Sequence, residues 1–163
     1  QLEVPIDAVQ AAAEAANGVV ILNPAPAPDE PLPPALLAAV DILVPNQTEL
    51  ATLSGHVGPV DATVAADLAR RLPAPAVIVT LGADGALVVT ADESTHVPAP
   101  RVDPVDTTAA GDSFCGAVAD ALVRGDTLVD AVRWAVRVGA ATTQRPGAQP
   151  SLPTPTEVDQ LLG

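Results

Sequence analysis

A run of small residues near position 110 brings an aspartate to the start of an apolar segment. Residues 106–117 read Asp-Thr-Thr-Ala-Ala-Gly-Asp-Ser-Phe-Cys-Gly-Ala. The small side chains of Ala109, Ala110 and Gly111 allow backbone N–H groups to converge, and a helix that follows adds the positive end of its dipole. This loop is suited to bind phosphate, and Asp112 lies where a base would be needed.

Phosphoryl transfer needs both of these groups. A phosphoryl group that moves between two oxygens needs fixed donors for the charge on its equatorial oxygens, and the attacking hydroxyl needs a carboxylate to take its proton. We therefore predict an anion hole at Ala109–Asp112, with Asp112 as general base. The alternative is a structural role, because an aspartate at a helix N-cap commonly stabilises only its own helix, by about 1 kcal/mol.

The elements that must position this loop alternate along the chain. The apolar pattern predicts buried strands at 19–22, 42–44 and 77–80, and a hairpin from 85–90 and 95–97. It predicts helices at 4–16, 48–53, 64–72, 113–124, 128–143 and 156–162. This alternation indicates an α/β fold with a mostly parallel sheet covered on both faces. Ligands bind such sheets beyond the carboxyl ends of the strands, where each polar motif of this chain is expected.

Two such motifs are ambiguous when they are taken alone. Asn46 and Glu49 follow a strand at the spacing of a near capping box, which needs no ligand. In the loop Thr80–Gly85, Gly82 and Gly85 free the backbone to approach a ligand closely. The same loop sequence also forms ordinary turns.

Composition limits the kinds of partner that this chain can have. Its 163 residues are enough for one domain with a core, and a 1% aromatic content means that Ala, Val and Leu must fill that core. The net charge of −13, with seven scattered arginines and no lysine, argues against nucleic acid and anionic membranes as partners. Cys115 cannot form an internal disulfide, and no apolar run or leader indicates a membrane, so we expect a cytoplasmic protein.

The string from Asp106 to Ala117 closely resembles the signature of the ribokinase-like sugar kinases, the phosphofructokinase-B group. Further segments resemble that family in the same order, namely Asn23–Ala27, Pro45–Glu49, Thr80–Gly85 and Gly147–Ser151. The resemblance implies a three-layer α/β/α fold. It also implies that residues 1–163 are the C-terminal nucleotide-binding and catalytic portion of such a domain, without its N-terminal strands and its β lid.

The resemblance implies roles for several residues that composition and spacing alone do not assign. Asn46 and Glu49 would help to hold Mg²⁺ and the phosphates, with Glu49 acting through metal-bound water, as suits an ion that keeps several waters. Glu3 and Asp112 would contact the sugar, although Glu3 could equally be a favourable acid at a helix start. The nucleotide, ATP, would lie against Thr80, Gly82, Asp84, Gly85 and Gly111.

The resemblance also implies a site for a monovalent cation, K⁺. Hard alkali ions prefer oxygen ligands, which carbonyl, carboxylate and hydroxyl groups supply. Pro146 differs from the residue that close relatives often have there, yet it keeps its carbonyl oxygen. The structural alternative is a loop that only ends a helix. The matched positions are Asp106, Thr108, Thr142, Arg145, Gly147 and Ser151.

Three functions follow as hypotheses. The first is ATP-dependent phosphorylation of the 5-hydroxyl of D-ribose to give ribose 5-phosphate, in a protein that is a homodimer at full length. The second is a kinase of the same family that acts on another sugar or on a nucleoside. The third is an inactive fragment that binds nucleotide, because most of the sugar contacts of the family have no counterpart here.

Overall fold

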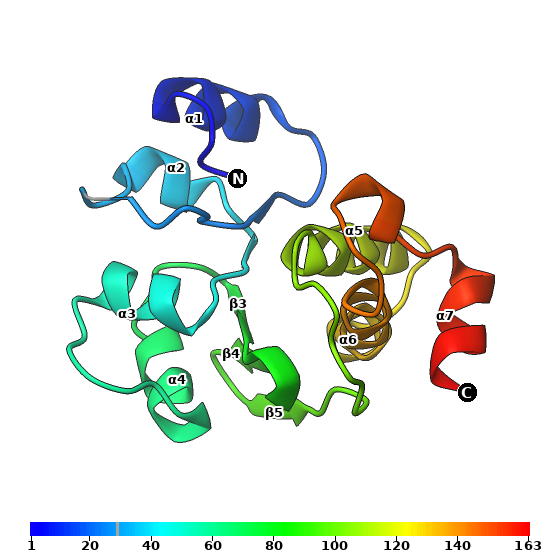
Figure 1. Cartoon of the computed structure of the whole chain (residues 1–163). Coiled ribbons are helices and arrows are strands. Elements are labelled where there is room, and N and C mark those ends of the chain that lie inside the picture. Colours follow the sequence, from blue (N-terminus) through cyan, green and yellow to red (C-terminus); the bar gives the residue numbers. More distant parts are fainter. Residues whose placement is uncertain (29) are drawn as a thin grey trace. The chain divides into compact units, whose positions relative to one another are not determined.

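The computed structural model describes residues 1–28 and 30–163, so one residue of the proline-rich segment after the first strand, Asp29, lies outside the described residues. The chain divides into two compact units (Figure 1). Unit 1 comprises residues 1–81 and 87–95, and unit 2 comprises residues 82–86 and 96–163. Every residue expected at the anion hole and at the cation site belongs to unit 2, so each unit is considered separately below.

A mixed five-stranded sheet has the order β1-β2-β3-β4-β5. Its strands are Ile21–Leu22, Ile42–Leu43, Ala76–Thr80, Ala86–Thr90 and Ser94–Val97. The first three strands are parallel, with Ile21 opposite Ile42 and Leu43 opposite Val77. The connections into β4 and β5 are too short for a parallel crossover, so these strands form antiparallel hairpins. All predicted strands are therefore present, although the first is shorter than expected.

Seven helices lie in the described part of the chain. Those of unit 1 are α1 (Ile6–Ala15), α2 (Pro34–Ala38), α3 (Gln47–Ser54) and α4 (Ala62–Ala69), and those of unit 2 are α5 (Ala110–Val123), α6 (Leu128–Thr142) and α7 (Pro155–Leu162). Six of them were predicted. Helix α2 was missed, because its segment reads as a proline-rich break. Pro34 in fact fits the first helical turn, and Leu36 is fully buried.

The core of unit 1 combines strand and helix side chains. Leu43 and Val77 of the parallel strands are buried together with Leu36 and Leu50 of the helices. Helices α3 and α4 pack against each other and against β3. Because the parallel strands are covered, they read as continuous apolar runs in the sequence, and this is why the pattern predicts them well.

The core of unit 2 is built mainly from small side chains on α5 and α6. Ala121 and Ala135 are fully buried, and Phe114 is the one aromatic ring of α5. A Cβ placed on Gly139 of α6 would lie 3.5 Å from the carbonyl oxygen of Ala110, the first residue of α5. Small residues therefore let the start of α5 lie close against α6.

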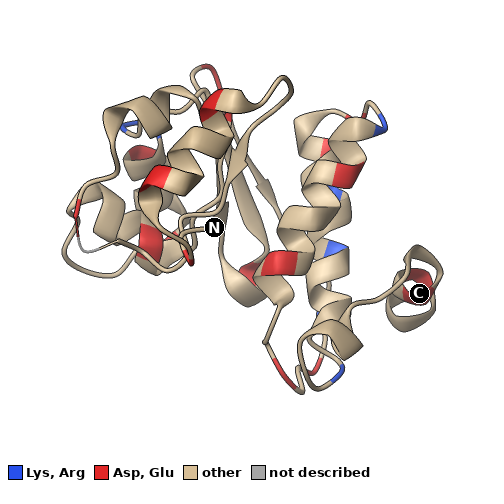
Figure 2. Cartoon of the chain, turned by 90° about the horizontal axis from the view of Figure 1, so that it is seen from above, with Lys and Arg blue, Asp and Glu red and all other residues tan. Residues whose placement is uncertain are grey.

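Charge is distributed without a basic cluster. Figure 2 shows acidic residues spread over the helices and loops of both units and only a few basic positions. The expectation that nucleic acid is not a partner stays a prediction, which rests on the net charge of −13. No helix in the described part of the chain is long and apolar enough to span a membrane.

Gly85 is essential to the turn between the short 3₁₀ helix Gly82–Asp84 and β4. Its φ is +94°, and a Cβ on it would lie 2.1 Å from the carbonyl oxygen of Val97 and 2.6 Å from the amide nitrogen of Ala99. The sequence predicts that a ligand approaches the backbone of Gly85 closely. In the structure, the backbone of Val97 and Ala99 makes this close approach.

Replacing Gly85 by alanine is expected to destabilise the chain by about 2 kcal/mol or more, because a backbone overlap adds to an unfavourable φ. The matched control is Gly116→Ala, in the exposed interior of α5 with open space around it, which should stabilise by up to about 1 kcal/mol. Urea unfolding midpoints measure both effects. Equal midpoints for the two variants would refute this account of Gly85.

Candidate active site

Helix α5 begins in an unusual way. Its N-cap is Ala109, which has φ 61° and ψ 5°, and no side chain caps the helix. Ala109 is the only residue other than glycine with positive φ among the described residues. A left-handed conformation costs an alanine about 1–2 kcal/mol, and alanine is also a poor N-cap. The rest of unit 2 must therefore stabilise this start.

The first turn of α5 presents backbone N–H groups outward. The amide of Ala110 donates to the Thr107 carbonyl at 3.2 Å, and the amide of Ser113 donates to the Ala109 carbonyl at 2.9 Å. Between them lies Gly111, whose amide has no acceptor within the helix because it belongs to the first turn. Gly111 is exposed, and nothing lies within 4 Å of a Cβ placed on it. An exposed amide in the first turn of a helix is the kind of donor that an anion site would use.

Asp112 is exposed and occupies the third position of α5. The interpretation of Asp112 as the N-cap is therefore wrong, since Ala109 holds that position. A carboxylate in the first turn still interacts favourably with the helix dipole. It directly follows Gly111 in the chain, so a carboxylate and an amide of the first turn lie on one short segment.

Asp106 joins the loop before α5 to the loop after α6. Its Oδ1 accepts from the amide of Thr108 at 2.9 Å, and its Oδ2 accepts from the amide of Gly147 at 2.8 Å. The bonds from Gly147 and Thr108 lower the pKa of Asp106 to about 2, so the group is an anion at neutral pH. The carbonyl of Thr143 accepts from the amides of Val105 and Asp106, at 2.7 and 3.1 Å.

A buried threonine supports the first turn of α5 from the side of α6. The hydroxyl of Thr142 lies 2.9 Å from Ser113 Oγ and 2.9 Å from the Val138 carbonyl oxygen. Ser113 Oγ in turn donates to the Ala110 carbonyl at 2.9 Å. Thr142 was expected as a cation ligand, and because its side chain holds α5, such a contribution would come from its backbone carbonyl. No local pattern in the sequence indicates a role for Ser113 or Thr143, because their partners lie far away in the chain.

The structure brings together part of the expected cation site. Asp106, Thr108 and Gly147 are linked directly by hydrogen bonds, whereas the hydroxyl of Ser151 is buried and donates to the Ala148 carbonyl at 2.7 Å. A carboxylate that stays ionised is an oxygen ligand of the type that alkali cations prefer, and both of its oxygens already accept amide hydrogen bonds here. The residues present thus fit a K⁺ ion by ligand type.

The side chain of Arg145 points elsewhere. Its Nη1 lies 2.8 Å from Glu157 Oε1 on α7, so a contribution to a cation site could come only from its backbone carbonyl.

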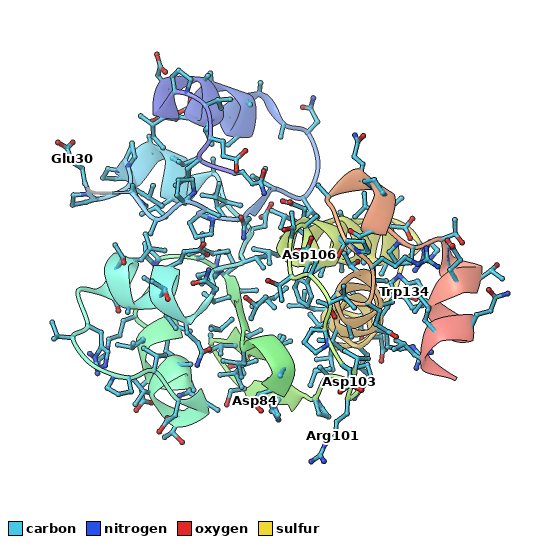
Figure 3. The ribbon with its side chains drawn as sticks, viewed as in Figure 1. Glu30, Asp84, Arg101, Asp103, Asp106 and Trp134 are labelled. Carbon is cyan, nitrogen blue, oxygen red and sulfur yellow. The ribbon has the colours of Figure 1, made fainter. Side chains whose placement is uncertain are left out.

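Figure 3 shows Asp106 beside α5, and Trp134 on α6. Trp134 is half-buried, and it lies three residues before Arg137, which reaches Asp159 on α7. Trp134 therefore belongs to the side of α6 that meets α7.

In unit 1, Asn46 and Glu49 form a complete capping box at the start of α3. Asn46 Oδ1 accepts from the Glu49 amide at 2.8 Å, and Glu49 Oε2 accepts from the Asn46 amide at 2.8 Å. Asn46 also pairs with Thr80 in a parallel bridge, so the ends of β2 and β3 meet there. Glu49 is buried, with 7% of its surface exposed. The structural alternative for this pair is therefore confirmed.

The remaining candidates lie on exposed turns. Asp84 ends the 3₁₀ helix, and its carbonyl oxygen lies 2.7 Å from Nε2 of His96 (Figure 3). Gly82 has φ +59° and open space around it. Glu3 is exposed, and the amide of the preceding Leu2 donates to the Ala25 carbonyl at 2.8 Å, which places Glu3 near the segment that follows β1.

No group of three or more His, Cys, Asp or Glu side chains in the described part of the chain could hold a metal by itself. A single buried carboxylate such as Glu49 fits instead an ion that retains its waters and is held mainly by substrate phosphates.

Comparison with known proteins identifies the family of this chain. Residues 2–155 match the model of the pfkB family carbohydrate kinases. The chain belongs to the pfkB family. A ribokinase of Staphylococcus aureus is 41% identical over 167 residues, which cover 99% of this chain and 54% of that protein. The chain thus spans about half the length of the curated relatives that it matches.

Solved structures give the same result for the fold. The crystal structure of a ribokinase from Thermotoga maritima superimposes with a TM-score of 0.89 at 36% identity, and covers 99% of this chain and 55% of that one. The structure of Arabidopsis thaliana ribokinase complexed with ribose and ATP also gives a TM-score of 0.89, at 32% identity, with 99% and 54% covered. The ribokinase-like α/β fold expected of a pfkB family member is therefore confirmed.

The low pKa of Asp106 leads to a prediction about acid stability. Because the folded state lowers this pKa from 3.8 to about 2, the stabilisation is complete above about pH 5 and is lost as the pH falls through 3.8 toward 2. Asp106→Asn should therefore lower the unfolding midpoint at pH 6, and the gap to the unmodified chain should close as the pH approaches 2. Asp103→Asn, at an exposed aspartate of the same loop, is the control and should show no such closing gap. A gap for Asp106→Asn that is independent of pH would contradict the assignment.

Proposed function

We propose that the protein transfers the γ-phosphoryl group of ATP to a primary hydroxyl of a sugar, with the 5-hydroxyl of D-ribose as the preferred acceptor and ribose 5-phosphate as the product. Residues 1–163 form the nucleotide-binding and catalytic portion of that enzyme. The observation that carries the proposal is the start of α5, where an uncapped first turn and an exposed carboxylate occupy the same short segment. Membership of the pfkB family supports the same reaction class.

Asp112 acts as general base in this proposal. Its carboxylate accepts the proton of the sugar hydroxyl as the oxygen attacks the phosphorus, and the bond from phosphorus to the bridging oxygen of ADP breaks. Exposure of Asp112 leaves it accessible to an acceptor. The sugar would also be held by Glu3, whose carboxylate can accept from sugar hydroxyls.

The anion hole consists of the backbone around Gly111. Peptide dipoles at Ala109–Asp112 are fixed before the reaction, so they stabilise the charge that develops on the phosphoryl oxygens without reorganising. The strained conformation of Ala109 supports this role, since such outliers persist where the surrounding structure enforces them and are common at functional sites.

The nucleotide would lie against Thr80, Gly82, Asp84, Gly85 and Gly111. Mg²⁺, when bound with ATP, would neutralise charge on the phosphates. Asn46 would help to place that ion and the phosphates, and Glu49 would act through waters of the ion; the capping box already holds the Glu49 carboxylate in one position. The cap and the orienting role are compatible, because the cap bond uses Oε2 of Glu49.

A monovalent cation, K⁺, would be held by oxygens of Asp106, Thr108, Thr142, Arg145, Gly147 and Ser151. When bound, it would add positive charge near the phosphate loop. The support for this proposal is the ionised Asp106 and its direct links to Thr108 and Gly147. We further propose that the whole protein is cytoplasmic and that it is a homodimer. Sedimentation of the purified protein would test the homodimer.

The identity of the acceptor is the least constrained part of the proposal. The resemblance of this chain to proteins named ribokinase favours ribose as the proposed acceptor over another sugar or a nucleoside. Initial rates with ribose, with other sugars that have a primary hydroxyl and with a nucleoside would rank these acceptors. If a nucleoside were used at a higher kcat/KM than ribose, the second hypothesis would replace the first.

The role of Asp112 predicts a large kinetic effect. In the whole protein, Asp112→Asn should reduce kcat by about 100-fold or more, because a positioned general base usually contributes that much. Asp120→Asn, which alters an exposed aspartate two turns later on α5, is the control and should keep the original kcat. A loss of only a few-fold in Asp112→Asn, with ATP and Mg²⁺ saturating, would exclude Asp112 as the base.

A further inference from the structure

We propose that Glu157 of α7 is a positioning residue for the phosphate-binding loop, and that it acts through Arg145 and the loop that holds Asp106. This inference rests on the proposed function, since it concerns how the same site is kept in shape. All of the residues involved lie in unit 2.

The contact between Glu157 and Arg145 is the first step. Arg145 Nη1 lies 2.8 Å from Glu157 Oε1, and the two side chains are only about one third exposed, at 34% and 33%. A partly shielded pair is held more firmly than a fully exposed one, because water and salt screen it less. Glu157 is therefore placed to fix where Arg145 lies.

Glu157 is itself held by its own helix. Its Oε2 accepts from the amide and from the hydroxyl of Thr154, each at 2.8 Å, in a capping box at the start of α7. These bonds, with that from Arg145, lower the pKa of Glu157 to about 2, so the carboxylate stays charged. Val158, the next residue, is fully buried, so its side chain packs α7 against the rest of the protein. Arg145 thus meets an anchored partner.

The loop after α6 carries this restraint to Asp106. Only Pro146 separates Arg145 from Gly147, and a proline ring restricts the backbone between them. The Gly147 amide donates to Asp106 Oδ2, while Asp106 Oδ1 accepts from the amide of Thr108, directly before Ala109. A continuous set of contacts therefore runs from α7 to the left-handed residue that starts α5.

The same pair of helices supplies a matched control. Arg137 Nη2 on α6 lies 3.1 Å from Asp159 Oδ1 on α7. This ion pair joins α6 itself to α7, whereas the pair of Arg145 joins the loop that carries Gly147 to α7. Loss of the Arg137 pair therefore reports the general effect of weakening α7, and loss of the Arg145 pair reports that effect plus the effect on the loop.

Amide hydrogen exchange, measured by NMR on the chain, tests the positioning directly. Glu157→Gln removes the charge but leaves an oxygen that can accept from Thr154, so α7 keeps part of its cap. We expect the Gly147 and Thr108 amides to exchange about 2- to 30-fold faster in this variant. In Asp159→Asn the two amides should exchange at the original rate. Equal exchange in both variants would overturn the proposal.

Kinetics of the whole protein separate a positioning role from a loss of stability. Glu157→Gln should lower kcat and raise the KCl concentration needed for half-maximal rate, each by about 2- to 30-fold, while KM for ribose is unchanged. Asp159→Asn should leave kcat and the KCl requirement unaltered. If Glu157→Gln changed neither quantity, the positioning role would be refuted even though kinase activity persisted. If exchange at Gly147 rose as expected but the unmodified protein transferred no phosphate, the contact network would stand and the proposed function would fail.

Discussion

The structure of unit 2 depends on one helix terminus that its own sequence does not stabilise. Helix α5 starts at an alanine in a left-handed conformation, without a side-chain cap. The compensation comes from neighbouring segments: Thr142 bonds to Ser113, the small Gly139 lets α6 approach Ala110, and Asp106 fixes the turn before Ala109. A capped terminus would have satisfied its own amides. The N-cap of α5 supplies no side-chain acceptor for these amides, and the packing of α5 on α6 offsets the energetic cost.

Asp106 shows how a single carboxylate can organise two loops. It precedes α5, yet one of its oxygens is bonded to Gly147, 41 residues later in the chain. The carbonyl of Thr143 also accepts hydrogen bonds from the amides of Val105 and Asp106 in the loop before α5. The hydrogen bonds that join the two loops are the same bonds that stabilise the ionised carboxylate, and they therefore lower the pKa of Asp106.

The sequence predicted the fold well because most of its signals are local or periodic. Apolar runs identified the strands, and spacing of apolar residues identified six helices. Helix α2 was missed because proline was taken as a break and not as a first-turn residue. Within the site, the small residues at 109–111 pointed to an anion hole, but the cap was misplaced at Asp112. Ser113, Thr143 and Glu157 could not be recognised, since their importance comes from partners brought near only by folding.

The source of positive potential at α5 has a consequence for how ligands arrive. It comes from aligned peptide groups and not from lysine or arginine, and the chain around it has a net charge of −13. The field of peptide dipoles fades within a few ångströms, whereas net charge acts over a Debye length of about 8 Å at physiological ionic strength. A polyanion therefore meets repulsion at long range and attraction only on arrival. If nucleotide binds there as proposed, its complex with a divalent ion should associate faster than the bare nucleotide, and added salt should accelerate the encounter, the reverse of the behaviour of proteins that steer phosphate with basic surfaces.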